Sequence, residues 1–90
     1  MLNYESLKLL KYRIMEIKTK FNLGDKVCGI SYAHKLVEFE VGKIEASLKA
    51  DGTEISYYPS DGKNGYMFSS FNERYCFAFR NEALAYIRGE

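Results

Sequence analysis

The sequence FNLGDKV at residues 21–27 marks the point at which the hydrophobic pattern of this chain changes. Before it, apolar residues recur with the three- and four-residue spacing of a helix, and after it they alternate as they do in strands. A glycine such as Gly24 is typical of the residue that ends a helix. The segment therefore predicts a helix that leads directly into the first strand of a small antiparallel sheet.

Residues 2–21 are expected to form this N-terminal helix, because no glycine or proline interrupts them. Five apolar side chains share one helix face: Leu7, Leu10, Ile14, Ile17 and Phe21. A helix of this length is marginal in isolation, so we expect the last four to be buried on the sheet of the same chain. An acidic surface of another molecule is the alternative. The flanking positions are all basic, which argues against a symmetric coiled coil: Lys11, Arg13, Lys18 and Lys20.

The strongest strand signal lies on both sides of Gly42. The odd-numbered residues from Val37 to Val41 are apolar, whereas the even-numbered residues from Ile44 to Leu48 are apolar after the glycine. A strand cannot exchange its two faces without an extra residue, so Gly42 predicts a β-bulge or sharp bend. One long strand bent at this glycine is expected to serve both halves of a strongly curved sheet.

The remaining elements follow from turn signals and alternation. A first strand is expected over residues 27–32, followed by a polar loop at residues 33–35. Beyond the bent strand, we expect a hairpin turn at residues 50–52, strands over 53–58, 66–71 and 74–79, a polar loop over 60–65, and a closing helix over 81–88 capped by Asn81.

Two segments of the chain resemble a known group of proteins. FNLGDKV resembles the opening strand of many SH3-like barrels, including Tudor and KOW-type domains, and RYCFAFRNEALAYI at residues 74–87 resembles small SH3-like proteins of Gram-positive bacteria and their phages. The expected fold class is therefore α+β: a small five-stranded antiparallel SH3-like barrel over residues 26–79, with an N-terminal helix over 2–21 and a short C-terminal helix over 81–88. Residues 1–90 are expected to form a single domain.

Composition narrows the class of protein. The chain has 90 residues, a net charge of +1 and 16% aromatic residues, which exceeds what so small a core can easily enclose. Some tyrosines are therefore expected to face solvent or a partner. The first twenty residues are too charged for a signal peptide, and no apolar run approaches the ~20 residues that cross a bilayer. We expect a cytoplasmic protein with reduced thiols and no membrane partner.

Residues that could support catalysis or bind metal are few. His34 is the single histidine, and no carboxylate stands at a recognisable offset to orient it toward Cys28 or Cys76 as a nucleophile. The two cysteines lack the spacing of a zinc site, although pairing of the first and last strands could make them neighbours. The loop at residues 60–65 lacks the phosphate-loop spacing. We expect no enzyme activity, no metal and no cofactor.

Aromatic and acidic side chains are the expected protein-binding residues. Four tyrosines fall at strand ends and loops, where stacking and cation–π contacts can anchor a partner: Tyr32, Tyr57, Tyr58 and Tyr66. Glu38 and Glu40 point to one face of a central strand, where they could await a basic partner or keep the sheet soluble. The expected function is a non-enzymatic protein-interaction module, such as a phage-type adaptor or inhibitor of a host protein.

Nucleic-acid binding is the alternative function. It would use the basic residues of the expected N-terminal helix: Lys8, Lys11, Arg13, Lys18 and Lys20. The near-neutral net charge and the acidic strands argue against it. The chain is expected to be a monomer or a homodimer, because an exposed edge strand could pair two copies.

Overall fold

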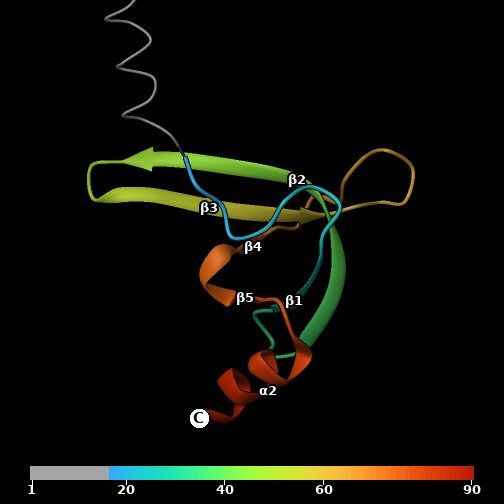
Figure 1. Ribbon diagram of the computed structural model, residues 1–90, viewed down its shortest axis with the longest axis vertical. Helices are drawn as coiled ribbons and strands as arrows, with labels where there is room; N and C mark the ends of the chain where they lie inside the picture. The colour runs from blue at the N-terminus through green and yellow to red at the C-terminus, as the bar shows by residue number, and fades with distance from the viewer. Residues whose placement is uncertain (1–16) are drawn as a thin grey trace, which may run out of the picture.

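The computed structural model describes residues 17–90 as five antiparallel strands and one short C-terminal helix (Figure 1). The elements are β1 (Lys26–Ile30), β2 (Leu36–Lys49), β3 (Gly52–Pro59), β4 (Phe71–Asn72), the 3-10 turn η1 (Glu73–Tyr75), β5 (Cys76–Phe77) and α2 (Arg80–Arg88). The strands lie in the order β4-β3-β2-β1-β5. No helix in this part of the chain is long and apolar enough to cross a membrane.

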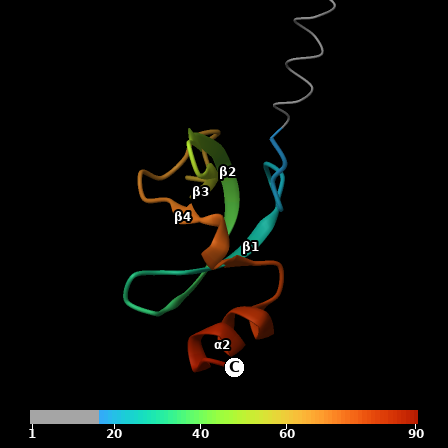
Figure 2. The ribbon, with the colours of Figure 1, turned by 90° about the vertical axis from the view of Figure 1, so that its left-hand side faces the viewer.

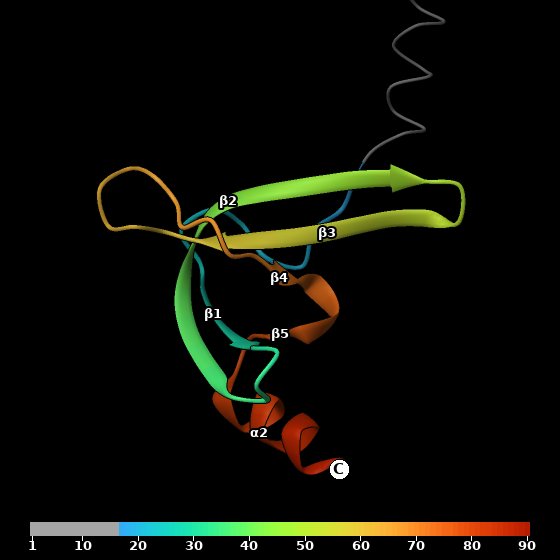
Figure 3. The ribbon, with the colours of Figure 1, turned by 180° about the vertical axis from the view of Figure 1, so that it is seen from behind.

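A bend in β2 divides the sheet into two halves. Residues Leu36 to Glu40 pair with β1, and the pairing with β3 begins at Val41. The register shifts between Val41 and Lys43, so the bulge expected at Gly42 is confirmed. Figures 1 and 3 show β2 curving from β1 into a long hairpin with β3. The hairpin turn expected at residues 50–52 is also confirmed, since Lys49 pairs with Gly52.

The main core lies inside the bend. Tyr57, Val27 and Cys76 are fully buried, and Val41 and Ile55 pack with them. A second, smaller cluster joins Cys28 and Ile30 of β1 to Ala83 of α2. Figures 1 and 2 accordingly place α2 beside β1 and β5, at the end of the molecule away from the β2–β3 hairpin. The cores stabilise the body of the sheet and leave the outer part of the hairpin less covered.

Gly29 lets two aromatic rings stack against the sheet. The rings of Phe39 and Phe71 lie with centroids 4.8 Å apart, and a Cβ atom at Gly29 would lie 2.7 Å from one ring and 2.9 Å from the other. Real Cβ atoms do not approach other atoms this closely, so either the rings or the strand would have to shift. The absence of a side chain at this position is therefore part of the core packing.

Replacing Gly29 with alanine is expected to lower the free energy of unfolding by roughly 1–3 kcal/mol, because overpacking forces these rings from their stacked position. Urea unfolding followed by circular dichroism measures the change. A second substitution, Phe71→Leu, removes one ring and is expected to recover part of the loss. A Gly29→Ala protein as stable as the parent would show that the rings move aside without cost.

The expected fold class is corrected in two respects: residues 17–21 do not form the end of an N-terminal helix, and the expected SH3-like barrel is an open sheet. The rest of the expected helix, residues 2–16, lies outside the described residues, and with it Leu7, Leu10 and Ile14. Phe21 is buried as expected, but Ile17 is 43% exposed. The backbone N–H groups of residues 20 and 21 donate to the side chain of Tyr57, so they are used by the sheet and not by a helix. Among the described residues no ladder joins β4 to β5, and the sheet remains open.

Two other expected elements differ near the C-terminus. The strands expected over residues 66–71 and 74–79 are reduced to β4 and β5, because Asn72 caps a 3-10 turn between them by accepting from the Arg74 N–H at 3.1 Å. The short C-terminal helix is present but begins at Arg80. Its cap is Phe79, whose backbone N–H donates to the Glu82 carboxylate at 3.2 Å, in place of the expected Asn81.

Candidate functional site

Two hollows with shared lining residues lie along β3, β4 and η1, and we call the two together the β3–β4 groove. The first hollow has a volume of about 370 Å³, and the second about 350 Å³. They share Glu54, Asn72 and Arg74. The first is otherwise lined mainly by charged side chains: Lys20, Lys49, Asp51 and Glu73. The second is otherwise lined by Tyr32, Ser56, Ser70 and Tyr75. The groove therefore has a charged end and an aromatic, hydroxyl-rich end.

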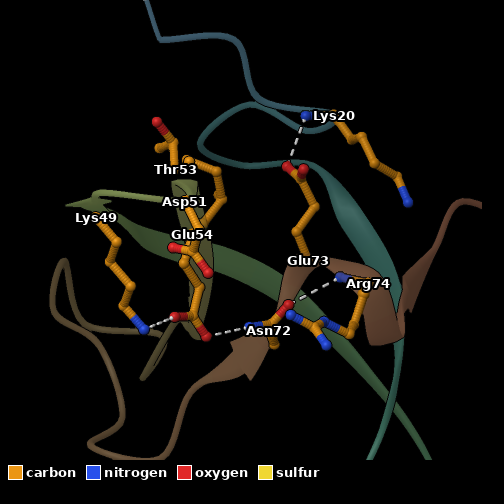
Figure 4. A pocket seen from close by; sticks show the side chains of 10 residues that line it. Lys20, Lys49, Asp51, Thr53, Glu54, Asn72, Glu73 and Arg74 are labelled. Atoms are coloured by element: carbon orange, nitrogen blue, oxygen red, sulfur yellow. Dashed lines mark hydrogen bonds and ion pairs between the residues drawn. The ribbon is translucent and has the colours of Figure 1, made fainter.

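Hydrogen bonds order the floor of the groove, as Figure 4 shows for the charged hollow. The Glu54 carboxylate accepts from Lys49 Nζ at 2.6 Å and from Asn72 Nδ2 at 2.5 Å. The Lys49 ammonium lowers the pKa of the Glu54 carboxyl by donating this hydrogen bond and by its charge. Asn72 also holds η1 through the Arg74 N–H. The exposed Arg74 guanidinium is thus carried on a turn whose start is capped.

Two tyrosines from distant parts of the chain line the second hollow. Tyr32 is fully exposed in the β1–β2 turn, which is closed by a hydrogen bond from the Ser31 N–H to the Lys35 carbonyl at 3.0 Å. Tyr75 belongs to η1, and its ring packs edge-on against Tyr86 of α2 at 5.9 Å. Tertiary structure therefore places at one hollow two tyrosines that are 43 residues apart in the sequence (75 − 32).

Tyr58 and Tyr66 form a separate cluster with Lys43, and none of the three lines the groove. The two rings meet edge-on at 5.5 Å, and the Lys43 ammonium lies 5.0 Å and 4.6 Å from their centroids. A hydrogen bond to the Tyr66 hydroxyl, 3.3 Å long, raises the pKa of Lys43. The two tyrosine rings thus already surround a cation of their own chain. Their contact with Lys43 also holds the loop over residues 60–65 to the sheet.

Tyr57 cannot be a binding residue, because it is fully buried. Its hydroxyl accepts the N–H groups of Lys20 at 3.1 Å and Phe21 at 3.2 Å and donates to the Glu73 carboxylate. Burial and the hydrogen bond to Glu73 raise the pKa of Tyr57 to about 12. Tyr57 therefore ties the segment before β1 to the core, and this corrects the expectation that it contacts a partner.

Some of the acidic and basic residues expected to bind a partner instead interact with other residues of the same chain. Glu38 pairs with Arg80 of α2 at 2.5 Å, and Glu40 lies opposite Lys26 in the β1–β2 register. Lys20 donates to the Cys76 carbonyl at 3.2 Å, and Lys18 is exposed. The other expected phosphate contacts fall outside the described residues: Lys8, Lys11 and Arg13.

The two cysteines lie on neighbouring strands but on opposite faces of the sheet. Cys28 pairs with Phe77, whereas Cys76 pairs with Gly29, so the two residues are offset by one position and point apart. Both thiols are free, and Cys28 packs near α2 while Cys76 packs in the main core.

His34 is exposed in the β1–β2 turn with a φ of 59°. No group of metal-ligating side chains occurs within residues 17–90.

Cys76 is expected to resist alkylation in the folded protein. Burial raises the pKa of its thiol from 9.0 to about 12, and a thiol that stays protonated does not react. Iodoacetamide labelling at pH 8, followed by mass spectrometry, is expected to be roughly 1,000-fold slower than in urea, because the thiolate fraction falls by that factor. Equal labelling rates in the two conditions would contradict the burial of Cys76.

Sequence reasoning found Tyr32 but missed Asn72, Arg74 and Tyr75. The available signal was Asn72 three residues before Tyr75, since asparagine often caps a short turn.

No protein-family model, curated protein or solved structure matches this chain. The chemistry of the groove itself therefore carries the functional argument.

Proposed function

We propose that this protein is a non-enzymatic protein-interaction module that binds an extended polypeptide segment of a partner in the β3–β4 groove. The observation that carries the proposal is that Tyr32 and Tyr75 line the same hollow. Tyrosine is enriched in the binding surfaces of proteins, because its ring buries a large area while its hydroxyl tolerates water. Tyr32 projects fully into solvent and has no buried role that would account for it.

The groove offers specific contacts to a polypeptide backbone and to charged side chains. Asn72, Ser56 and Ser70 can exchange hydrogen bonds with a partner's peptide groups. Arg74 can bind a carboxylate with two parallel hydrogen bonds, and it lies 5.9 Å from the Tyr75 ring. The preferred segment therefore carries an acidic residue beside an apolar or aromatic one. An adaptor or inhibitor of the phage type, acting on a host protein, could use such a groove.

Nucleic-acid binding is less favoured by the described residues. The first hollow contains Asp51, Glu54 and Glu73 beside its basic side chains, which opposes a phosphate backbone. Lys20 also uses its ammonium group within the chain. A salt titration separates the two functions: phosphate-driven binding would weaken steeply between 50 and 200 mM salt, at about a tenfold loss or more, whereas aromatic anchoring would weaken little.

Site-specific photocrosslinking tests the proposal. A photoreactive phenylalanine analogue at position 32 is expected to crosslink a partner protein in the native host, while the same analogue at the exposed position of Phe79, outside the groove, is not. The double variant Tyr32→Ala, Tyr75→Ala is expected to reduce capture of that partner about 10- to 100-fold, as loss of two aromatic anchors does. Crosslinking from position 79 alone, or unchanged capture by the double variant, would contradict groove binding.

A further inference from the structure

The outer half of β2 has an unpaired edge. β1 pairs with β2 only over Leu36 to Glu40, so residues 43–49 bond to β3 on one side and to no described strand on the other. Figures 1 and 3 show this half of β2 along the border of the hairpin, away from β4, β5 and α2. We call residues 43–49 the free edge of β2. In an antiparallel ribbon, half of the backbone N–H and C=O groups of such an edge point outward and can pair with another strand.

The two faces of the free edge differ in chemistry. Ala46 pairs with Ile55 and Leu48 with Thr53, on the face that continues into the core, yet Leu48 is 58% exposed. The opposite face carries Glu45 and Lys49. Here an unpaired backbone edge coincides with an exposed apolar strip and with charges of both signs.

We propose that two copies of this chain pair antiparallel through the free edges of β2, with a two-fold axis at Ser47. In this register residues i and j lie opposite each other when i + j equals 94. Glu45 of one copy then lies opposite Lys49 of the other, and the symmetry repeats this pair. Ala46 lies opposite Leu48 in the same way. The two hairpins become one four-stranded sheet. Across the new strand pair, opposite charges face each other and apolar residues face apolar residues.

Neighbouring registers lack this complementarity. An axis at Ala46 would oppose Lys43 to Lys49, and an axis at Glu45 would oppose the two copies of Glu45. An axis at Leu48 would oppose Glu45 to Asp51. Axes between two residues would place the apolar face of one strand against the polar face of the other. Like charges directly opposed on a sheet are destabilising, so the axis at Ser47 is selected among these neighbouring registers.

Existing contacts within the chain do not block the register. Lys49 Nζ donates to Glu54 at 2.6 Å, but an ammonium group has three donors and can also reach the partner's carboxylate. Glu45 lies 3.5 Å from Lys43 and remains exposed. Pairing through β2 leaves the second hollow, on the other side of β3, open in each copy. The dimer would carry two β3–β4 grooves and could bind two partner segments. Formation of the dimer does not depend on binding in the groove.

Measurement of molar mass in solution tests the dimer. Sedimentation equilibrium between about 1 µM and 1 mM is expected to show a rise from 10.4 kDa toward twice that mass. A mass of one chain over the whole range would overturn the proposal, and so would a mass of three or more chains. Because this measurement contains no partner, its result is independent of the proposed function.

Charge exchange tests the register. Glu45→Lys and Lys49→Glu each create two like-charge pairs, so each variant alone is expected to dimerise at least about tenfold more weakly. An equimolar mixture of the two variants restores opposite charges at every pair and is expected to form a heterodimer, as in designed specificity switches. The double variant Glu45→Lys, Lys49→Glu is expected to dimerise like the parent, and circular dichroism checks that each variant is folded. Single variants that dimerise as well as the parent, or a mixture that stays monomeric, would overturn the register.

Discussion

Replacing Tyr57 with phenylalanine is expected to lower the free energy of unfolding by about 2 kcal/mol. The phenylalanine ring fills the same space, so the edge contact with Phe21 at 5.4 Å is kept and only the hydroxyl is lost. That hydroxyl accepts two backbone N–H groups and donates to Glu73. The buried N–H of Phe21 would have no other described partner, and an unsatisfied buried donor costs about 1–3 kcal/mol.

The neighbouring residue provides a matched control. Tyr58→Phe removes a hydroxyl that lies 3.4 Å from Glu45 at the surface, and it is expected to change the free energy of unfolding by no more than about 0.5 kcal/mol. Guanidinium unfolding of both variants measures the difference. Equal stabilities of the two variants would show that the buried hydroxyl contributes nothing to the fold.

Stability is also expected to fall at alkaline pH because of Tyr57. Its pKa is raised from 10.0 to about 12 in the folded chain, so the folded state holds the phenolic proton more tightly than the unfolded state. The resulting stabilisation is complete below pH 10 and is lost as the pH rises toward 12. Unfolding curves between pH 9 and 12 are expected to show this loss in the parent and a smaller one in Tyr57→Phe. Parallel pH curves for the two proteins would contradict the raised pKa.

Replacing Gly42 with alanine is expected to have the other large effect, roughly 3 kcal/mol. A Cβ atom at this position would lie 2.7 Å from Ser60 Cα and 3.0 Å from the Gly65 carbonyl oxygen. These are backbone atoms, which cannot rotate away as the end of a side chain can. The bend of β2 would have to open, and overpacking of this kind costs 1–3 kcal/mol or more. Ser60 also donates its N–H to the Glu40 carbonyl at 2.7 Å, so the strain would reach the pairing of the loop with β2.

Lys63→Ala, at an exposed position of the loop over residues 60–65, is the control for Gly42→Ala, and its expected effect on stability is within about 0.5 kcal/mol. Thermal unfolding compares the two variants. A Gly42→Ala protein that melts with the control would show that the bulge tolerates a side chain.

Local sequence patterns were sufficient to predict the elements whose formation depends on residues close together in the sequence. The change of parity at Gly42, the turn after Lys49 and the presence of a short C-terminal helix all follow from residues within a few positions of one another. The expected helix does not continue through residues 17–21, because the periodicity from Leu7 to Phe21 says nothing of tertiary hydrogen bonds. The backbone of Lys20 and Phe21 bonds to a tyrosine more than 35 positions away.

The candidate site was harder to predict for the same reason. Alternation placed Tyr57 on the face of Ile55, but the burial of its hydroxyl depends on Glu73 and on the segment before β1. Tyr58 and Tyr66 meet around Lys43 because the loop after β3 closes back on the sheet through the Ser60–Tyr66 bridge. Tyr75 reaches the groove on a 3-10 turn where alternation predicted a strand.

The most direct test of groove binding is a nuclear magnetic resonance titration of the labelled protein with the partner segment identified by crosslinking at position 32. The largest amide shift changes are expected at Tyr32, Asn72, Arg74 and Tyr75, with little change along α2. Largest changes at Glu38 and Arg80, or confined to residues 43–49, would place the partner elsewhere and contradict the role of the groove.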